Sequence, residues 1–377
     1  MFSYWEQQSF TQYQHIIIGA GIVGLSVAIE LRQRFPKERI LILERGMMST
    51  GASSRNAGFA CMGSATELLA DLKTMPEEDV LLLFARRKKG LEILRQRLGD
   101  DRIVYAANGS YELIDEANLP AIEQLHYLNQ LLYPICQSEA FRLANERIAG
   151  FGFDQNFTKA LIENTCEGEL HTGKMLRALS DLALDHNIEI KTNAAVSHFE
   201  ETEKGVQVFV PDSLRNESWA LHGDKLYICT NAFTKQLLPD ENVVPGRGQV
   251  LLTKPIEQLR FKGIFHFDDG YYYFRVIDHR VLFGGGRNLD FSTEQTTEIA
   301  LNTDIQAHLQ QLLKNVILPQ TPFEIEQQWA GIMAFGDTKT PIVRAFSPRI
   351  YGAFRMGGMG VALGSEVAQC LVHDIAL

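Results

Sequence analysis

The chain has 377 residues, of which 45% are hydrophobic and 22% are charged. This is the composition of an ordinary globular protein, and it excludes a disordered, collagenous or coiled-coil chain. The 36 Lys and Arg against 46 Asp and Glu give a formal net charge of −10, so we expect no nucleic-acid partner and no broad surface for anionic membranes.

Five cysteines are scattered along the chain without a CxxC pair, which argues against a secreted disulfide framework and favours a reducing, cytoplasmic location. The most apolar run, residues 16–29, is shorter than the roughly 20 residues of a transmembrane helix. The preceding MFSYWEQQSF has Glu6 as its only charged side chain, so it lacks the positive region of a signal peptide. We therefore expect no transmembrane segment and interpret the apolar run as a buried strand and helix.

Residues 15–31, HIIIGAGIVGLSVAIEL, predict a strand, a tight turn and a helix. In a dinucleotide site of this kind, Gly19 permits the turn, Gly21 lets the backbone approach a pyrophosphate, and Gly24 lets the helix pack closely on the strand. The helix N-terminus then faces the phosphates, where unpaired N–H groups stabilise negative charge. A glycine-rich turn without a ligand is the alternative.

The next strand, within RILILERG, ends in Glu44, 20 residues after Gly24, where an acidic side chain can hold ribose hydroxyls. The acid disfavours NADP, but this motif alone does not separate FAD from NAD. The following STGASSRNAGF crowds hydroxyl, amide and guanidinium groups that could hold a diphosphate. The same residues are common in ordinary loops, so composition leaves both interpretations open.

In the middle of the chain, residues 77–98 predict a long amphipathic helix, and we interpret its basic run RRKK, residues 86–89, as a solvated face. Residues 171–185 predict another helix. Strands are expected in IEIKTNAAVSHFE from residue 188, in GVQVFV and in KLYICTNAF, which runs into Thr230 and Asn231 as a candidate N-cap. These elements extend an α/β sheet.

From residue 243 to 290 the pattern is rich in strands, and YYYFRVID with HRVLFGG predicts a hairpin. Alternation places Tyr271, Tyr273 and Arg275 on one face and Tyr272 and Phe274 on the other. One face could line a pocket, or the aromatic rings could pack against a neighbouring element.

The last segment, RIYGAFRMGGMGVALGSEVAQCLV, predicts a short strand, a glycine loop and a final helix. That helix could direct its N-terminus at the far end of an extended cofactor. A flavin would use such an element because its reduction places negative charge on the ring. A plain helix start is the alternative.

These motifs resemble the FAD-dependent superfamily of D-amino-acid oxidase, glycine oxidase and sarcosine oxidase over essentially the whole chain. The tracts that carry the resemblance are HIIIGAGIVGLSVAIEL with ILILERG, SSRNAGF, EGELHTGKMLRAL, CTNAF, VPGRGQ, the YYYFR to FGGGR hairpin and MGGMGVALGSEVA. CTNAF, RGQ and FGGGR look most like the branch that includes γ-glutamylputrescine oxidase. The resemblance implies FAD as cofactor. It assigns the FAD contacts to Gly19, Ala20, Gly21, Ile22, Val23, Gly24, Glu44, Arg45, Ser53, Ser54, Arg55, Asn56, Ala57, Gly58, Val196, Thr230, Asn231, Gly357, Gly358, Met359, Gly360 and Val361.

Two positions depart from the family pattern. In the glycine oxidase pattern a Trp-x-Gly segment precedes an arginine that holds the substrate carboxylate, whereas WAGIMAF has Ile332 and Met333 there. We therefore do not expect carboxylate binding in that mode. Sarcosine oxidases link the flavin through a cysteine just before Thr-x-Thr-Pro, whereas FGDTKTP has Phe335 near that place. We therefore expect a non-covalent flavin.

The expected fold is α/β, with a Rossmann-type FAD-binding domain assembled from separate segments and a largely antiparallel β substrate domain that also contains helices. We assign residues 1–75, 145–235 and 326–377 to the FAD-binding domain and residues 76–144 and 236–325 to the substrate domain. The ligand should lie where the two meet.

The resemblance implies oxidation of the C–N bond of a small-molecule amine or amino acid, with hydride transfer to flavin N5, hydrolysis of the imine, and oxygen or an electron carrier as acceptor. The alternatives are a flavin-dependent 2-hydroxy-acid dehydrogenase that reduces a quinone or carrier, an NAD dehydrogenase, and a non-catalytic flavin-binding protein. No metal is expected, because the ten histidines form no HExxH motif or Cys/His cluster.

Our candidates for the substrate face are Tyr271, Tyr273 and Arg287, with Arg287 either an anion partner or part of a salt bridge. Arg247 and Gln249 are candidates for the entrance loop. We assign no general base, because hydride transfer from a neutral amine does not require one. Cys61 is interpreted as a small buried hydrophobic residue and not as a nucleophile.

Overall fold

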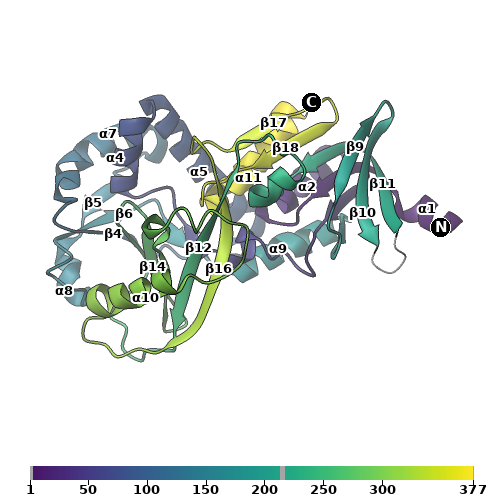
Figure 1. Cartoon of the computed structure of the whole chain (residues 1–377). Coiled ribbons are helices and arrows are strands. Elements are labelled where there is room, and N and C mark those ends of the chain that lie inside the picture. Colours follow the sequence, from purple (N-terminus) through teal and green to yellow (C-terminus); the bar gives the residue numbers. More distant parts are fainter. Residues whose placement is uncertain (1–2, 213–216, 377) are drawn as a thin grey trace.

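The structure is a computed structural model that describes residues 3–212 and 217–376. Within these residues the strands form two eight-stranded sheets and one two-stranded sheet. Figure 1 shows the first large sheet on the side of the N-terminus and the second on the opposite side, with the C-terminal helix between them. This mixed architecture confirms the predicted α/β class with a second, largely antiparallel sheet.

The first sheet is built around short apolar strands that pair in parallel. Its central strand, β1, pairs in parallel with β2 and with β11, and β11 pairs in parallel with β18. Both faces of β2 are buried, as expected for a parallel sheet covered on both sides. The strands of this sheet are β17 (Ile342–Ala345), β18 (Ile350–Phe354), β11 (Glu217–Ile228), β1 (Gln12–Ile18), β2 (Ile40–Leu43) and β8 (Glu189–Lys191), with β10 (Gly205–Asp212) and β9 (His198–Thr202) added beside β11.

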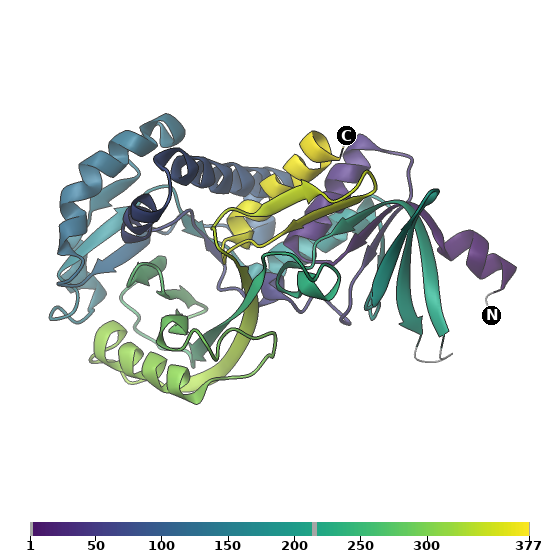
Figure 2. The same ribbon diagram turned by 45° about the horizontal axis from the view of Figure 1, so that its top comes forward.

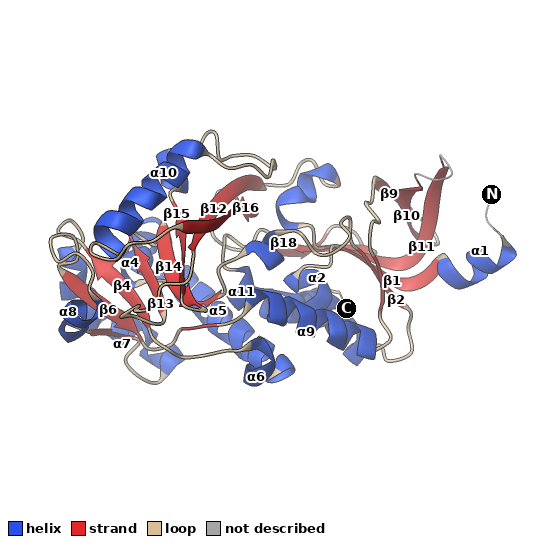
Figure 3. Cartoon of the chain, turned by 90° about the horizontal axis from the view of Figure 1, so that it is seen from below, coloured by secondary structure: helices blue, strands red, loops and turns tan. Residues whose placement is uncertain are grey.

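Helices α2 (Ile22–Arg34), α9 (Thr172–Asp185) and α11 (Gly360–Cys370) lie on one side of this sheet (Figure 3). The long helix α5 (Glu77–Leu98) runs from the region of the second sheet to α11 (Figure 2). The two helices cross closely at Gly90, where a Cβ would lie 2.1 Å from the carbonyl oxygen of Ala362.

The bounds of α5 match the prediction, but the solvated-face interpretation of its basic run is wrong for two of the four residues. Arg87 is buried and donates to the carbonyl oxygen of Met62. Arg86 pairs with Glu366 of α11, with 2.9 Å between Nε and Oε2. The reason is that α11, far away in the sequence, covers Arg86, whereas Arg87 lies against the segment that holds Met62 and Glu67.

The second sheet is antiparallel except where β13 pairs with β4. The predicted hairpin is confirmed as β14 and β15, with Tyr272 and Phe274 buried in an aromatic core on one face. In order, its strands are β16 (Ile325–Phe335), β12 (Val244–Thr253), β15 (Arg280–Gly285), β14 (Tyr272–Ile277), β13 (Ile264–Phe267), β4 (Ser110–Ile114), β6 (Ala160–Asn164) and β5 (Phe141–Leu143).

The remaining elements are short and connect or cover the two sheets. The helices are α1 (Tyr4–Phe10), α3 (Ala52–Arg55), α4 (Ala65–Thr74), α6 (Asp100–Ile103), α7 (Leu125–Cys136), α8 (Ile148–Phe151) and α10 (Thr303–Leu312). The 3-10 helices are η1 (Leu119–Gln124), η2 (Asn145–Arg147), η3 (Asn231–Gln236) and η4 (Arg287–Leu289), and the π-helical turns are η5 (Leu313–Ile317) and η6 (Leu371–Ile375). Strands β3 (Phe59–Ala60) and β7 (Gly168–Glu169) form the two-stranded sheet.

Local pattern and long-range pairing differ in two respects. The segment from residue 188 contains two short strands, β8 and β9, where we expected one. The domain ranges stay a prediction. However, β6 lies within a range assigned to the FAD-binding domain, and β16 overlaps another such range, yet both strands pair in the second sheet. Their partners, β4 and β12, lie elsewhere in the chain, so local sequence pattern does not reveal this pairing.

The helices of the described residues were expected to include no transmembrane segment. Among residues 3–212 and 217–376, the structure contains no helix with the length and apolar character needed to cross a membrane.

Candidate active site

A cavity of about 880 Å³ extends between the two sheets. Its volume lies in the upper part of the range of about 300–1,000 Å³ that ligand sites occupy. One part is lined by the turn after β1, the end of β2, the α3 region and the start of α11. The other part is lined by α4, the β14–β15 hairpin and β16. The cavity can therefore hold an extended ligand together with a second, smaller molecule.

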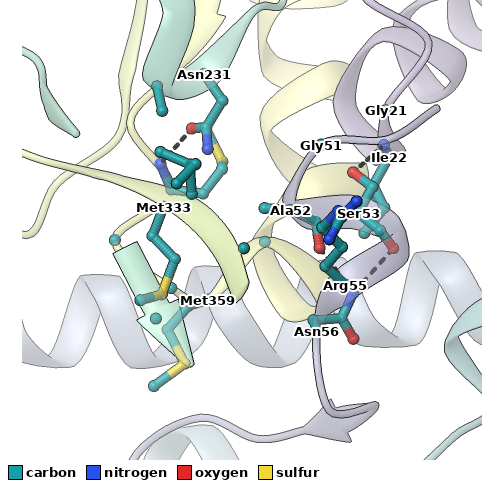
Figure 4. A pocket seen from close by; sticks show the side chains of 18 of the residues that line it. Gly21, Ile22, Gly51, Ala52, Ser53, Arg55, Asn56, Asn231, Met333 and Met359 are labelled. Atoms are coloured by element: carbon teal, nitrogen blue, oxygen red, sulfur yellow. Dashed lines mark hydrogen bonds between the residues drawn. The ribbon is translucent and has the colours of Figure 1, made fainter. Parts of the chain in front are cut away.

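The turn between β1 and α2 has the geometry that the glycine spacing predicts. Gly19 has a φ of +104°, which favours glycine. A Cβ on Gly24 would lie 1.9 Å from the carbonyl oxygen of Gly19, so the helix can approach the strand only without a side chain there. Gly21 is the N-cap of α2, and the backbone N–H of Ile22 donates to Ser53 Oγ at 3.0 Å (Figure 4).

Glu44 stands at the end of β2 and lines the same part of the cavity. Its two carboxylate oxygens accept backbone hydrogen bonds from Ala20 and Gly46, each at 3.0 Å. These bonds hold the carboxylate beside the glycine turn. The guanidinium of Arg45, the next residue, lies 3.5 Å from the centre of the Phe233 ring, and burial lowers the pKa of this arginine.

The polar loop around α3 is built as a structured turn. Asn56 Nδ2 donates to the carbonyl oxygen of Ser53 at 2.9 Å, and its Oδ1 accepts from the backbone N–H of Gly58 at 2.9 Å. Arg55 Nη1 donates to the carbonyl oxygen of Ala330 in β16 at 2.9 Å. The loop is thereby attached to the second sheet while Ser53, Arg55 and Asn56 line the cavity.

The C-terminal glycine loop lines the cavity from another side. Gly357 and Gly358 have φ values of +56° and +83°, and α11 begins two residues later. Asn231 Oδ1 accepts the backbone N–H groups of Arg355 at 3.1 Å and Met356 at 3.3 Å, which fixes the end of β18. Asn231 therefore positions the glycine loop in addition to lining the cavity.

Two methionine side chains line one part of the site, and one of them, Met333, comes from the WAGIMAF segment. Met333 and Met359 both line the cavity, and they lie together in the view, apart from Ser53 and Asn56 (Figure 4). The Cys61 Sγ lies 3.8 Å from the Met359 Sδ. Burial raises the pKa of Cys61 well above its usual value, which agrees with its interpretation as a small hydrophobic residue.

Arg287 is the sequence candidate whose environment is most informative. Its guanidinium carbon lies 4.1 Å from the centre of the Phe335 ring and 5.0 Å from that of Phe291. The buried Nε has no hydrogen-bond partner, and no carboxylate within residues 3–212 and 217–376 forms an ion pair with this side chain. Burial lowers its pKa. The structure therefore contradicts the salt-bridge alternative and leaves an arginine in the cavity with free donors.

Lys339 also lines the cavity, and its ammonium is paired with two carboxylates. Its Nζ lies 3.0 Å from Glu67 Oε1 and 2.6 Å from Asp71 Oδ1. Glu67 also lies 3.7 Å from the Arg87 guanidinium. This cluster joins α4 to the loop after β16, so the charge of Lys339 is matched by carboxylates whereas, among the described residues, that of Arg287 is not.

His266 lines the cavity and was missed by the sequence analysis. It lies on β13 opposite Tyr273, and burial lowers its pKa to about 4, so the imidazole is neutral at pH 7. Its buried Nε2 has no hydrogen-bond partner among the described residues. The strand pattern of GIFHF could have indicated this position, because cross-strand partners point to the same face and His266 pairs with Tyr273.

The structure places most of the predicted site residues together. Tyr271, Tyr273 and Arg287 line the cavity, whereas Arg247 and Gln249 do not lie at its entrance, because both are buried in hydrogen bonds to Glu294. The residues assigned to cofactor contacts that line the cavity are Gly19, Gly21, Ile22, Val23, Glu44, Arg45, Ser53, Arg55, Asn56, Ala57, Val196, Thr230, Asn231, Gly357, Gly358, Met359, Gly360 and Val361. Ala20, Gly24, Ser54 and Gly58 are next to it in the chain but do not line it.

Buried Glu112 in β4 supports the start of α4 and makes stability depend on pH. It accepts from the backbone N–H of Thr66 at 3.2 Å and from the Thr66 hydroxyl. Burial raises its pKa from 4.5 to about 7, so its contribution to stability is full below pH 4.5 and is lost as the pH rises through 7. The free energy of unfolding of Glu112→Gln minus that of wild type should therefore be about 3 kcal/mol larger at pH 8 than at pH 4.5.

Urea unfolding of both proteins at the two pH values measures this difference. Glu116→Gln, in the exposed turn after β4, controls for the loss of one carboxylate elsewhere on the chain. An equal effect of Glu112→Gln at both pH values would show that the glutamate does not take up a proton on folding.

Comparison with known proteins supports one family. The sequence model of the DAO family, FAD dependent oxidoreductase, matches residues 14–373. The chain is 24% identical over 396 residues to the probable oxidoreductase OrdL of Haemophilus influenzae, covering 97% of this chain and 84% of that protein.

Solved structures share the fold. Glycine oxidase from Geobacillus kaustophilus has a TM-score of 0.77 and 19% identity, covering 97% of this chain and 95% of its own. L-proline dehydrogenase from P. horikoshii has a TM-score of 0.77 and 16% identity, covering 96% and 92%. Iminodiacetate oxidase from Chelativorans sp. BNC1 has a TM-score of 0.74 and 18% identity, covering 95% and 94%.

Proposed function

Because the chain belongs to the DAO family of FAD-dependent oxidoreductases, we propose that it oxidises the C–N bond of an amine that also carries a carboxylate, as an amino acid does. The observation that carries this proposal is Arg287, a half-buried cation that lines the cavity, has a buried Nε without a hydrogen-bond partner, and has no carboxylate partner in the described part of the chain. A partly buried guanidinium is stabilised by a ligand that supplies a negative charge and two paired hydrogen-bond acceptors, as a carboxylate does.

The cavity fits FAD, the cofactor of the family. A Cβ at Gly21 would meet Ser53 Oγ at 2.8 Å, so glycine at this position lets the turn after β1 lie close to the polar α3 loop that lines the same cavity. We assign the adenosine and pyrophosphate to the part of the cavity lined by Gly19, Gly21 and Glu44, and the flavin to the part lined by Met359 and Gly360. When bound, FAD supplies the two-electron acceptor of the reaction.

We propose that FAD is bound without a covalent link. Phe335 lines the cavity near the position where sarcosine oxidases have their linking cysteine. Among the described residues, the cysteines that line the cavity are Cys61 and Cys229. Burial raises the pKa of both thiols, so both stay protonated and are poor nucleophiles.

The chain's own residues would bind and orient the substrate. Arg287 holds the carboxylate, while Phe335 and Met333 line the cavity beside it and exclude water. Neutral His266 can accept a hydrogen bond from the substrate amine without adding a second positive charge. Two electrons and two protons leave the substrate, which becomes an imine that water hydrolyses, and oxygen accepts the electrons to give hydrogen peroxide.

An anaerobic screen of the FAD-loaded protein tests the proposal. We expect N-methyl amino acids, D-amino acids or other carboxylated amines to bleach the visible flavin absorbance, and the matching amines without a carboxylate to do so weakly. Bleaching by 2-hydroxy acids alone would identify a 2-hydroxy-acid dehydrogenase, and no bleaching would favour a non-catalytic flavin-binding protein. In air, turnover without release of hydrogen peroxide would show that the electron acceptor is a quinone or a carrier and not oxygen.

A further inference from the structure

Two cysteines outside the cavity lie against each other. The Sγ atoms of Cys136 and Cys166 are 3.4 Å apart, although the residues are separated by 30 positions in the sequence. Cys136 is the last residue of α7, and Cys166 lies in the turn between β6 and β7. Both are free thiols and both are partly exposed, so a small reagent in solution can reach them.

The backbone on both sides of this pair is held in place. The backbone N–H of Thr165 donates to the carbonyl oxygen of Ala140 at 2.9 Å, and its hydroxyl donates to that of Glu139 at 2.7 Å. The backbone N–H of Cys166 donates to Asn164 Oδ1 at 2.9 Å. These bonds join the turn after β6 to the segment after α7, so the proximity of the sulfur atoms is a property of the fold.

The environment favours the thiolate at one member of the pair. The hydrogen bond with Cys136 lowers the pKa of Cys166 to about 7, and the positive charge of Lys88 acts in the same direction. Burial raises the pKa of the three remaining cysteines, Cys61, Cys229 and Cys370. Cys166 is therefore the cysteine most ready to react at neutral pH.

We propose that Cys136 and Cys166 form a redox-active dithiol that hydrogen peroxide converts to a disulfide. The Cys166 thiolate attacks one oxygen of the peroxide, the O–O bond breaks, and hydroxide leaves and takes up a proton to form water. Cys136 then attacks the Cys166 sulfenic acid, the S–O bond breaks, and a second water forms. Each sulfur gives up one electron overall, and the peroxide takes up two.

The turn that carries Cys166 also supports the cavity wall. The next residue, Glu167, accepts backbone N–H groups from Met62 at 2.6 Å and Gly63 at 2.9 Å, and the Ser110 hydroxyl at 2.6 Å. The segment before Met62 lines the cavity through Cys61. A disulfide at Cys166 would thus lock the turn that holds this wall.

Peroxide treatment of the FAD-loaded full chain, without any amine, tests the proposal independently of the proposed function. We expect the number of free thiols to fall from five to three, the peptides containing Cys136 and Cys166 to become joined, and dithiothreitol to reverse both changes. Cys136→Ser and Cys166→Ser should each abolish the joined peptide. Cys370→Ser, which removes a half-buried cysteine outside the pair, should leave it unchanged.

Two outcomes would overturn the proposal. One is oxidation of Cys166 to sulfinic or sulfonic acid in the wild type without any joined peptide. The other is retention of five free thiols under conditions in which a small model thiol is fully oxidised. If Cys136→Ser fails to fold, Cys136→Ala takes its place, and its peptide map is compared with that of untreated wild type.

Discussion

Replacement of Arg287 by glutamine is expected to lower kcat/KM for a carboxylated amine by about 10²–10³-fold, because it removes the cation that would pair with the carboxylate inside the cavity. The same substitution should change kcat/KM little for the matching amine without a carboxylate. The difference between the two substrates is the informative quantity, since it cancels any general effect of the variant on folding or on FAD. Steady-state kinetics with both substrates, after the FAD content has been determined, measures it.

Two further variants separate charge from packing at this position. Arg287→Lys keeps the charge but loses the planar group that lies over Phe335, so part of the carboxylate preference should return. Arg280→Gln removes an arginine from β15, the strand that precedes Arg287. The Arg280 Nε pairs with Glu326 at 2.6 Å near the surface, so both substrates should react as with wild type. Equal losses for both substrates in Arg287→Gln would mean that Arg287 acts through its contact with Phe335.

The first part of the fold could be predicted from sequence because its contacts are local. One strand, one turn and one helix contain residues 12–18, Gly19 and Gly24. The spacing of the glycines therefore predicts how closely the helix packs on the strand. Glu44 follows on the neighbouring strand, which pairs with β1 in parallel. The helix over residues 77–98 was equally clear from its periodicity.

The features that were missed depend on residues that meet only in the folded chain. Nothing near Arg86 in the sequence indicates that Glu366 of α11 will pair with it. Similarly, Lys339 joins Glu67 and Asp71 of α4 across more than half of the chain. Helical periodicity assigns a face to each helix, but it does not say whether that face meets water or another helix.

The substrate side shows the same limit at a single residue. The sequence left two roles open for Arg287, an anion partner or a member of a salt bridge, because an arginine side chain can serve in either role. The choice between them depends on which carboxylates lie nearby, and Glu294, the carboxylate whose charge acts on Arg287, forms its ion pair with another arginine. Arg247, which looked equally available in sequence, is paired with Glu294.

The second large effect is expected at Gly24, which does not line the cavity. We expect Gly24→Ala to lower FAD affinity by about 10- to 100-fold, because overpacking of a close contact costs about 1–3 kcal/mol. The added Cβ would lie 1.9 Å from the Gly19 carbonyl oxygen and 3.3 Å from Ile17 Cγ2. Backbone at the first contact cannot rotate away as a side chain can, so the turn itself has to move.

The matched control is Gly150→Ala in α8, where an added Cβ meets nothing within 4 Å. Both variants add one methyl group, but only Gly24→Ala should lose FAD on desalting and require more FAD in a fluorescence titration. Circular dichroism of both proteins then separates loss of the site from loss of the fold. If Gly24→Ala bound FAD as tightly as Gly150→Ala, the close approach of α2 to β1 would not determine the shape of the turn. The cofactor contacts would then have to be assigned mainly to Glu44, the α3 loop and the start of α11.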